Sequence, residues 1–432
     1  MNSSSVRGRI RAASGASLPG WSSKSGWVTA GGLRGIGALH RPIMMPAMEQ
    51  NLRVPGPTPL PLEVREAQSA PMIDHRGTEF AEMLREISSG LATLIGTSGE
   101  VLLLTGSGSG ALEAAIVNSL SPGDRVLGVT IGSFGDRFAK TASAFGAEVE
   151  RFEVPWGSAA DPAALAEHLA ANPPYRAVLL THNETSTGVT NPLQALAAVV
   201  RAAPGEPLLL VDGISGLGAM PFEMDAWGID MVVSASQKAF MASPGIAIAA
   251  LSPRAWEATG SARMPRVYWD FREARTMAEK GQTPWTPAVS VLYGLRVGVA
   301  RLIAEGRERT WARHAAIASA VHAGLEQLGL RLVAAPDDRS HTVTAAWLPE
   351  GLEWGPFNGA MRARGLIVAG GQGAWVGRIL RFGHMGAVGI DEMCDAVRVM
   401  GETLVDQGHA ADPSEAVEAM RKVFEESLSA VG

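Results

Sequence analysis

The sequence predicts an α/β fold, with a mostly parallel central sheet in a large domain and a smaller α+β domain at the C-terminal end. The chain has 432 residues, which exceeds the roughly 250–300 residues that one hydrophobic core usually supports. Between about residues 100 and 250, short apolar runs alternate with amphipathic stretches, and after about residue 305 this alternation stops. Such alternation is typical of a parallel sheet that helices cover on both faces.

The apolar runs are the expected strands of the large domain, and the amphipathic stretches are its expected helices. The runs lie at residues 101–105, 125–129, 148–154, 177–181, 208–211, 231–234 and 246–251. The helices are expected at residues 111–120, 136–144, 162–171 and 193–203. Because ligands of such sheets bind beyond the carboxyl ends of the strands, we expect the chemistry at that edge.

The expected organisation is an extension over residues 1–47, a large domain over 48–305 and a small domain over 306–432. The small domain should contain helices at 310–328, 355–364, 391–407 and 413–428, and strands near 330–334 and 342–347. Residues 1–48 hold six basic residues and no acidic one, which fits an organelle transit peptide. They show no clear amphipathic helix, so we favour a disordered extension, or a natural start at Met44, Met45 or Met48.

Composition excludes several classes of protein. Hydrophobic residues make up 46% and charged residues 19% of the chain, which is not the composition of a disordered protein. The formal net charge of −6 gives no reason to expect nucleic-acid binding, and the absence of a run of about 18 apolar residues argues against a membrane span. The single cysteine, Cys394, excludes an intramolecular disulfide and a cysteine-based metal cluster, and suits a reducing, cytoplasmic compartment.

A glycine-rich segment, Thr-Gly-Ser-Gly-Ser-Gly-Ala at residues 105–111, follows the first expected strand and opens a helix. Glycines let backbone N–H groups approach an anion, and a helix N-terminus favours negative charge, so this is a candidate phosphate cradle. The segment also fits the loose dinucleotide pattern G-x-G-x-x-A. That alternative requires an acidic residue at the end of the second strand, and residues 126–130 end in Thr130 without one. A plain strand-to-helix turn is the third interpretation.

Two candidate catalytic residues follow later strands. Asp212 ends the apolar run at 208–211, where a buried charge is costly unless it is paired. A protonated pyridine nitrogen is a suitable partner; a helix N-cap or a metal ligand are the alternatives, and no nearby acid or histidine supports the metal. Lys238 follows the run at 231–234, where an amine can form a Schiff base with an aldehyde and then move a proton between two carbons.

The ordered set of these motifs resembles the class V aminotransferases, the group that includes alanine–glyoxylate and serine–glyoxylate aminotransferases. The resemblance covers residues 52 to about 401. Its motifs are Val-Pro-Gly-Pro-Thr-Pro at 54–59, the glycine segment, His-Asn-Glu-Thr-Ser-Thr-Gly at 182–188, Val-Asp-Gly at 211–213, Ser-Gln-Lys at 236–238 and Arg-Phe-Gly-His-Met-Gly at 381–386. It implies pyridoxal 5′-phosphate (PLP) as the cofactor and PLP fold type I as the architecture.

The resemblance also implies roles for matching residues. Lys238 would form the Schiff base, and Asp212 would pair with the pyridinium nitrogen. The phosphate would be held by Ser107, Gly108, Ser109 and Gln237. The pyridine ring would contact Phe134, which stacks on it where many relatives have tryptophan or tyrosine, and Thr185, which hydrogen-bonds near its hydroxyl or the substrate. Relatives with histidine in place of Ser109 leave the role of that serine open.

The resemblance places further residues at the substrate and at a second subunit. Thr286 would reach the phosphate of the neighbouring subunit's cofactor, which implies an obligate homodimer. Arg381 and Gly56 would contact the substrate, because a planar guanidinium binds an α-carboxylate with two hydrogen bonds. Arg378 is the competing arginine. If residues 380–382 form a strand, Arg378 and Arg381 point to opposite faces, and the motif favours Arg381.

We therefore predict a PLP-dependent transaminase that moves an amino group from alanine or serine to glyoxylate or pyruvate. Residues 73–77 and 268–271 would line the side-chain pocket; His75 and Arg76 suggest an acidic donor such as aspartate, or only a structured loop, which we favour. A lyase or desulfurase of the same family is the alternative, although a desulfurase needs a mobile thiol and Cys394 lies in an expected helix. A binding protein that lost its activity would lack Lys238, Asp212 or Arg381, and a nicotinamide dehydrogenase would need the missing acid.

Overall fold

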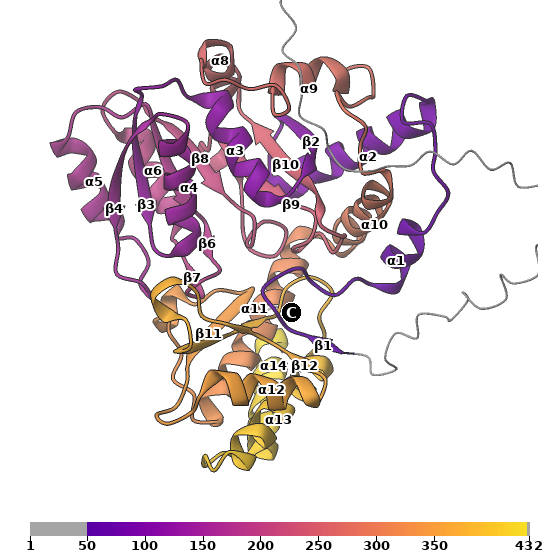
Figure 1. The fold of residues 1–432 in the computed structure, drawn as a ribbon, viewed down its shortest axis with the longest axis vertical. Helices are drawn as coiled ribbons and strands as arrows, with labels where there is room; N and C mark the ends of the chain where they lie inside the picture. The colour runs from indigo at the N-terminus through magenta and orange to yellow at the C-terminus, as the bar shows by residue number, and fades with distance from the viewer. Residues whose placement is uncertain (1–49, 430–432) are drawn as a thin grey trace, which may run out of the picture. The chain divides into compact units, whose positions relative to one another are not determined.

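The computed structural model describes residues 50–429, so the predicted extension at 1–47 lies outside the described part of the chain. The main sheet has the strand order β2-β10-β9-β8-β5-β3-β4 (Figure 1). Its strands are β2 (Glu100–Gly106), β3 (Arg125–Thr130), β4 (Glu148–Glu153), β5 (Ala177–Thr181), β8 (Leu208–Asp212), β9 (Met231–Ala235) and β10 (Gly245–Leu251). Strands β4, β3, β5, β8 and β9 pair in parallel, and β10 is antiparallel to β9 and β2. The predicted α/β class with a mostly parallel sheet is confirmed.

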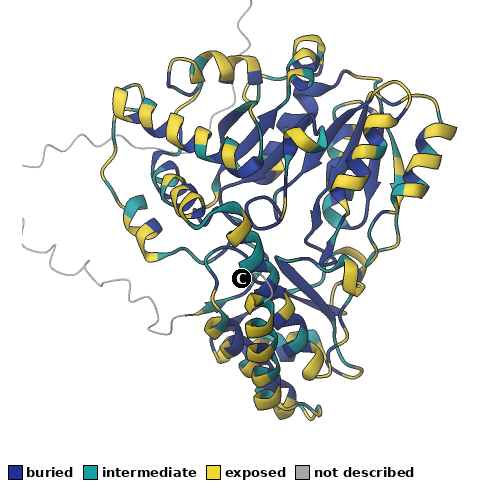
Figure 2. Ribbon diagram, turned by 180° about the vertical axis from the view of Figure 1, so that it is seen from behind, coloured by how far each residue is buried: buried dark blue, intermediate teal, exposed yellow. Residues whose placement is uncertain are grey.

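Helices cover both faces of this sheet, because alternate residues of each buried strand point in opposite directions. Leu209 packs in a cluster with α2, α5, α6 and α10, whereas Leu210 packs in a second cluster with α3, α4, α8 and α9. The helices of this part are α1 (Leu62–Gln68), α2 (Thr78–Ile95), α3 (Gly108–Ser119), α4 (Ser133–Ala144), α5 (Pro162–Ala171), α6 (Leu193–Ala202), α7 (Met224–Trp227), α8 (Pro253–Ser261), α9 (Phe271–Ala278) and α10 (Val289–Glu305). Figure 2 shows the buried sheet between helices whose outer faces are exposed.

The C-terminal elements build a third hydrophobic cluster around a small antiparallel sheet of order β11-β14-β13. They are α11 (Arg307–Gln327), β11 (Val343–Trp347), α12 (Trp354–Ala363), β12 (Leu366–Ile367), β13 (Ala369–Gly370), β14 (Ile379–Gly383), α13 (Ile390–Asp406) and α14 (Pro413–Ser429), with short 3₁₀ turns η1 (Pro336–Asp338) and η2 (Gly373–Trp375). Strand β1 (Asn51–Leu52) pairs in parallel with β12, so the start of the described chain lies beside its C-terminal elements.

The expected strand near residues 330–334 is wrong. Leu332 forms an isolated bridge with Ala346, flanked by hydrogen bonds from Trp347 N–H to the Arg331 carbonyl and from Val333 N–H to the Ala345 carbonyl. The ladder stops there because the chain bends at once into η1, which begins at Pro336. Proline cannot donate to a strand ladder, so apolar composition alone did not produce a strand.

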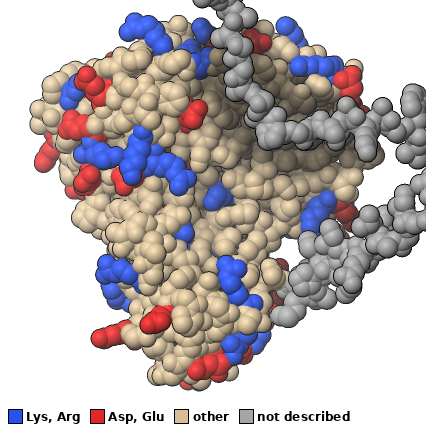
Figure 3. Space-filling model, in the orientation of Figure 1, with Lys and Arg blue, Asp and Glu red and all other residues tan. Residues whose placement is uncertain are grey.

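Two more features of the described residues concern the surface. Figure 3 shows basic and acidic side chains interspersed on the face drawn, with most of that face uncharged. Within residues 50–429, every helix is too short or too polar to cross a membrane.

Buried histidines form a second internal feature near the C-terminal elements. His314 on α11 is the clearest case, because both of its ring nitrogens are hydrogen-bonded. Its Nδ1 lies 2.7 Å from the Thr310 carbonyl oxygen and therefore carries the hydrogen, and its Nε2 accepts the Gly386 N–H at 3.1 Å. An imidazolium has no lone pair to accept that second bond, so His314 is neutral in the folded protein. Burial lowers the pKa of His314 to about 3, and the charge of Arg313 adds to the effect.

Two further buried histidines also have lowered pKa values. Burial lowers the pKa of His182 to about 4 and that of His384 to about 3. The unfolded chain binds protons on these side chains below about pH 6.5, the ordinary histidine pKa, whereas the folded chain does so only at much lower pH. Their contribution to stability is therefore complete above that pH and is lost as the pH falls.

We expect acidification below about pH 6.5 to reduce the free energy of unfolding, with each such histidine contributing up to about 1.4 kcal/mol per pH unit. The variant His314→Gln lacks one imidazole that binds a proton in the unfolded chain. The fall between about pH 6.5 and 5 should then be shallower by up to that slope, as measured by chemical denaturation at a series of pH values.

The matched control is His409→Gln, which makes the same substitution at a half-buried histidine after α13. Burial raises the pKa of Asp212, so this residue makes the free energy of unfolding rise as the pH falls. The effect is the same in the wild type and both variants, and it therefore does not alter the difference between their slopes. Equal slopes in His314→Gln and the wild type would contradict the prediction.

Candidate active site

A cavity of about 150 Å³ lies where β5, β8 and β9 end and where α3 and α4 begin. It lies at the carboxyl ends of the strands, where the sequence predicts the catalytic residues. Most of the residues singled out from the sequence line it, together with others: Ser107, Gly108, Ser109, Leu112, Phe134, Arg137, Asn183, Thr185, Asp212, Ile214, Ser215, Gln237 and Lys238.

Lys238 and Asp212 enter this cavity from neighbouring parallel strands. Asp212 is the last residue of β8, opposite Val233 of β9, and Lys238 follows β9. The Lys238 ammonium donates to the Pro55 carbonyl oxygen at 2.6 Å. Burial lowers the pKa of Lys238 to about 8, while the charge of Asp212 opposes that shift. The amine is therefore closer to losing its proton near neutral pH than a surface lysine is.

Burial raises the pKa of Asp212 to about 7. The Ile214 N–H, which donates to its Oδ1 at 2.9 Å, opposes the shift, and the negative charge of Glu184 adds to it. A buried carboxyl group with a raised pKa would be stabilised in its charged form by a cationic partner.

Gly56 leaves the space that the Lys238 side chain occupies. A Cβ atom on Gly56 would lie 2.5 Å from the Lys238 Nζ, and the Gly56 φ of +132° is one that other residues rarely adopt. A side chain at position 56 would therefore displace the lysine.

The glycine segment forms the N-terminus of α3, as expected, but packing explains two of its glycines. Ser107 is the N-cap and accepts the Gly110 N–H at 3.4 Å. A Cβ atom on Gly106 or Gly110 would lie 2.5 Å or 2.7 Å from the ring of Trp269, so these two positions make room for an indole. Ser107, Gly108 and Ser109 are the residues of this segment that line the cavity.

Glu184 holds the start of α4, and with it Phe134. Its carboxylate is fully buried and accepts the Phe134 and Gly135 N–H groups, both at 3.0 Å, and the Ser186 hydroxyl at 2.6 Å. Burial raises the pKa of Glu184, and the hydrogen bonds from Ser186, Gly135 and Phe134 oppose that shift. Because every partner is a donor, the ionised carboxylate is the form that satisfies them.

Arg381 approaches the cavity from the C-terminal part through Thr185. It is 6% exposed on β14, and it donates from Nε to the Gly370 carbonyl oxygen at 2.8 Å and from Nη1 to the Thr185 carbonyl oxygen at 3.2 Å. Thr185 lines the cavity, and its hydroxyl donates to the Ser215 hydroxyl at 2.9 Å. Burial lowers the pKa of Arg381 to about 10, and Glu184 opposes the shift. Arg378 is exposed and lies over the Trp347 ring instead.

Three sequence-predicted features lie away from the cavity within this chain. Thr286 is exposed, next to Trp285, whose ring stacks on Tyr268 with centroids 5.6 Å apart. Arg76 donates to the Thr283 carbonyl oxygen at 2.8 Å and to Gln282 at 2.9 Å, which favours the structured-loop interpretation of residues 73–77. Cys394 is buried on α13, and burial raises the pKa of its thiol.

Arg137, Asn183 and Ser215 line the cavity but were not selected from the sequence, and Glu184 was part of a motif without an assigned role. Arg137 could have been found, because it follows Phe134 by three residues on one helix and such residues share a face. Asn183 and Ser215 could not, because only the fold brings them within 2.9 Å of each other.

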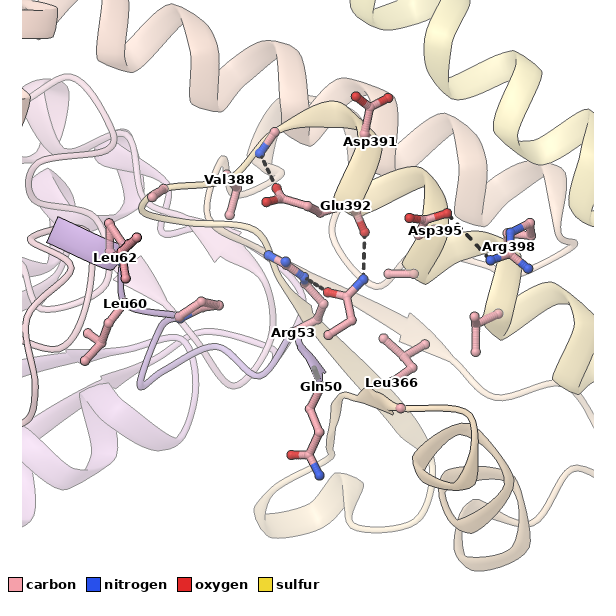
Figure 4. Close-up of a pocket in the computed structure, with 18 of the residues that line it drawn as sticks. Gln50, Arg53, Leu60, Leu62, Leu366, Val388, Asp391, Glu392, Asp395 and Arg398 are labelled. Atoms are coloured by element: carbon pink, nitrogen blue, oxygen red, sulfur yellow. Dashed lines mark hydrogen bonds and ion pairs between the residues drawn. The ribbon is translucent and has the colours of Figure 1, made fainter. Parts of the chain in front are cut away.

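A larger cavity of about 1210 Å³ lies elsewhere, between α1, α13 and the start of the described chain (Figure 4). Its charged side chains are largely paired among themselves, as in the bond from Arg313 to Glu305 at 2.6 Å and the contact of Arg398 with Asp395 at 3.6 Å. Its described lining contains arginines and acids but no lysine. The residues with perturbed pKa values at the strand ends make the smaller cavity the candidate active site.

Known proteins resemble this chain over most of its length. A family model described as aminotransferase class-V matches residues 62–379. A protein of Synechococcus sp. named as the small subunit of a soluble hydrogenase is 39% identical over 363 residues, which cover 83% of this chain and 94% of that protein. The L-aspartate–glyoxylate aminotransferase of Paracoccus denitrificans is 39% identical over 340 residues, covering 78% and 86%. The solved alanine–glyoxylate aminotransferase of a Nostoc species is 28% identical with a TM-score of 0.78, covering 84% of this chain and 97% of the other.

We expect Glu184→Gln to lower the free energy of unfolding by about 2–4 kcal/mol, because an amide NH₂ would face N–H donors that now have a carboxylate. Chemical denaturation at neutral pH measures this loss. Glu148→Gln, at the exposed start of β4, is the control and should change the value by less than about 0.5 kcal/mol. A loss in Glu184→Gln as small as that of the control would be inconsistent with the capping role.

Proposed function

This chain belongs to the class-V aminotransferase family, and on that premise we propose that it moves an amino group from alanine or serine to a 2-keto acid such as glyoxylate or pyruvate. The observation that carries the proposal is the meeting of Lys238, Asp212 and the N-terminus of α3 in one cavity. The chain is a PLP-dependent transaminase with PLP fold type I. Glyoxylate as acceptor is suggested by the names of the Paracoccus and Nostoc relatives, which are both glyoxylate aminotransferases.

The residues of the cavity fit the cofactor. Because Gly56 has no Cβ atom, the space beside the Lys238 amine stays open. Asp212 is a buried acid without a cationic hydrogen-bond partner among the described residues. When bound, PLP supplies an electron sink that stabilises negative charge at the amino-acid carbon. Lys238 would hold it, Asp212 would pair with its ring nitrogen, and Phe134 would lie against its ring. Ser107, Gly108, Ser109 and Gln237 would hold the phosphate.

Lys238 would also move the proton of the reaction. A group transfers protons best when its pKa lies near the working pH, and burial lowers the pKa of Lys238 to about 8. Its Nζ would accept a proton from one carbon and return it to another. Thr185, whose hydroxyl is hydrogen-bonded to Ser215, would orient the ring hydroxyl or the substrate.

Arg381 would bind the α-carboxylate, with Gly56 beside the substrate. Two of its N–H groups are already held by the Gly370 and Thr185 carbonyls, which orient the guanidinium and leave further donors for a carboxylate. The enzyme would act as a homodimer, in which the exposed Thr286 reaches the phosphate bound by the neighbouring subunit.

Aspartate as donor is the second candidate, because the Paracoccus relative is named for it. The loop expected to recognise an acidic side chain gives less support, since Arg76 is held by Thr283 and Gln282. A desulfurase would need a reactive thiol, and Cys394 is buried. The hydrogenase name of the Synechococcus relative does not fit this chain, whose single cysteine leaves no set of thiolate ligands for a metal cluster.

We expect purified protein supplied with PLP to show the visible absorption of a lysine-bound aldehyde cofactor, and Lys238→Ala to lack it, because the alanine has no amine. Absorption spectroscopy measures this directly. Lys140→Ala removes an exposed lysine of α4 and should keep the band. A wild type without the band, or a Lys238→Ala protein that retains it, would refute the cofactor assignment.

A donor panel of alanine, serine and aspartate against glyoxylate and pyruvate should give the highest kcat/KM for alanine or serine with glyoxylate. Arg381→Gln should lower kcat/KM for every donor by roughly 30- to 1000-fold, because all donors share the α-carboxylate. Steady-state kinetics measures both results.

Arg378→Gln is the matched control for this panel, since Arg378 is exposed three residues away, and it should keep kcat/KM within about threefold. Higher kcat/KM for aspartate than for alanine and serine would replace the proposed donor with the second candidate. An Arg381→Gln defect confined to one donor would instead assign Arg381 to side-chain recognition.

A further inference from the structure

Arg137 is a positively charged residue of the cavity that has no part in the proposed function as described. Among the described residues that line the cavity, two carry a full positive charge, Lys238 and Arg137. Arg137 lies one helical turn after Phe134 on α4. Its guanidinium carbon is 4.9 Å from the centroid of the Phe134 ring, and its Nη1 donates to the Ser109 hydroxyl at 3.3 Å. It therefore lies between the aromatic ring and the N-terminus of α3.

The Arg137 side chain is exposed, and its charge opposes the rise in the Asp212 pKa that burial causes, without a direct contact between the two side chains. Within residues 50–429, Arg137 forms no ion pair, whereas the adjacent Asp136 contacts Arg151 at 3.9 Å. The Ser109 hydroxyl is neutral and can turn to donate its own hydrogen elsewhere. The positive charge of Arg137 is therefore available to an anion at the N-terminus of α3.

An anion in this cavity needs such a charge. A phosphate monoester carries a charge of about −1.5 to −2 at neutral pH, whereas a helix N-terminus supplies only about half a positive charge. The nearby acids Asp212 and Glu184 repel an anion, and both are buried. Lys238 is needed for the bond to the cofactor aldehyde, so it does not supply the missing charge.

We propose that Arg137 is the charge partner of the cofactor phosphate, binding it with a guanidinium fork beside Ser109. This inference rests on the proposed function. It makes the phosphate site a combination of a neutral cradle, contributed by α3, and a cation contributed by α4. The contact with the Phe134 ring orients the guanidinium, and bidentate geometry makes arginine better suited than lysine to this role.

The test separates the phosphate from the rest of the cofactor. The full-length protein is stripped of cofactor and titrated with PLP and with pyridoxal, which lacks the phosphate, while the absorption of the lysine-bound aldehyde is followed. We expect Arg137→Gln to weaken PLP binding by roughly 10- to 100-fold and to change pyridoxal binding by less than about threefold. Arg137→Lys should lose less PLP affinity, because it keeps the charge but not the fork.

Lys140→Gln is the matched control, since Lys140 is an exposed cation on the same helix outside the cavity, and it should bind both ligands as the wild type does. Equal losses for PLP and pyridoxal in Arg137→Gln would overturn the inference, because Arg137 would then act on the ring through Phe134. Unchanged PLP binding would overturn it as well. If the wild type binds PLP through Lys238, either result refutes only the role of Arg137; if the wild type binds neither ligand, the proposed function fails.

Discussion

The parallel pairing of β8 with β9 is the constraint on which the candidate active site depends. It sets Asp212 opposite Val233, so that the acid at the end of one strand and the lysine just after the next reach the same cavity. Each strand is buried on both sides, with Leu209 and Leu210 packed in separate hydrophobic clusters. Slipping the register by one residue would exchange these two faces, so the packing of the whole sheet holds the acid and the lysine in place.

Burial shifts the pKa values of the charged side chains at the cavity, and it also lowers the stability of the folded protein. An unpaired charge away from water costs several kcal/mol, and the protein lowers this cost in different ways. Glu184 is surrounded by N–H and O–H donors, and Arg381 donates to two carbonyl oxygens. Asp212 and Lys238 are left less satisfied, with the pKa values of both displaced toward neutrality. The cofactor would complete this pair.

Two segments distant in sequence contribute to the same small volume. The hairpin of β6 (Asn183–Glu184) and β7 (Val189–Thr190) supplies Glu184, which fixes the start of α4, and Thr185, whose carbonyl oxygen is bound by Arg381 of β14. The large sheet, α4 and the C-terminal sheet are thus joined at the cavity by hydrogen bonds rather than by apolar contact alone. A structural change in any of these elements should therefore shift the position of Phe134 or Arg381.

The sequence by itself determined the strand–helix alternation, the carboxyl edge as the place of the chemistry, and the selection of Lys238, Asp212 and the glycine segment, because these depend on local periodicity and on motifs of adjacent residues. Only the tertiary structure decided that Gly106 and Gly110 make room for Trp269, that β1 pairs with β12, that Glu184 caps α4 and that Arg137 meets Ser109. These are contacts between segments tens to hundreds of residues apart, and local pattern carries no information about which distant side chain fills a given space. The same limit explains the missing strand near residue 332, where the neighbouring turn at Pro336, and not the apolar run, decided how far the ladder extends.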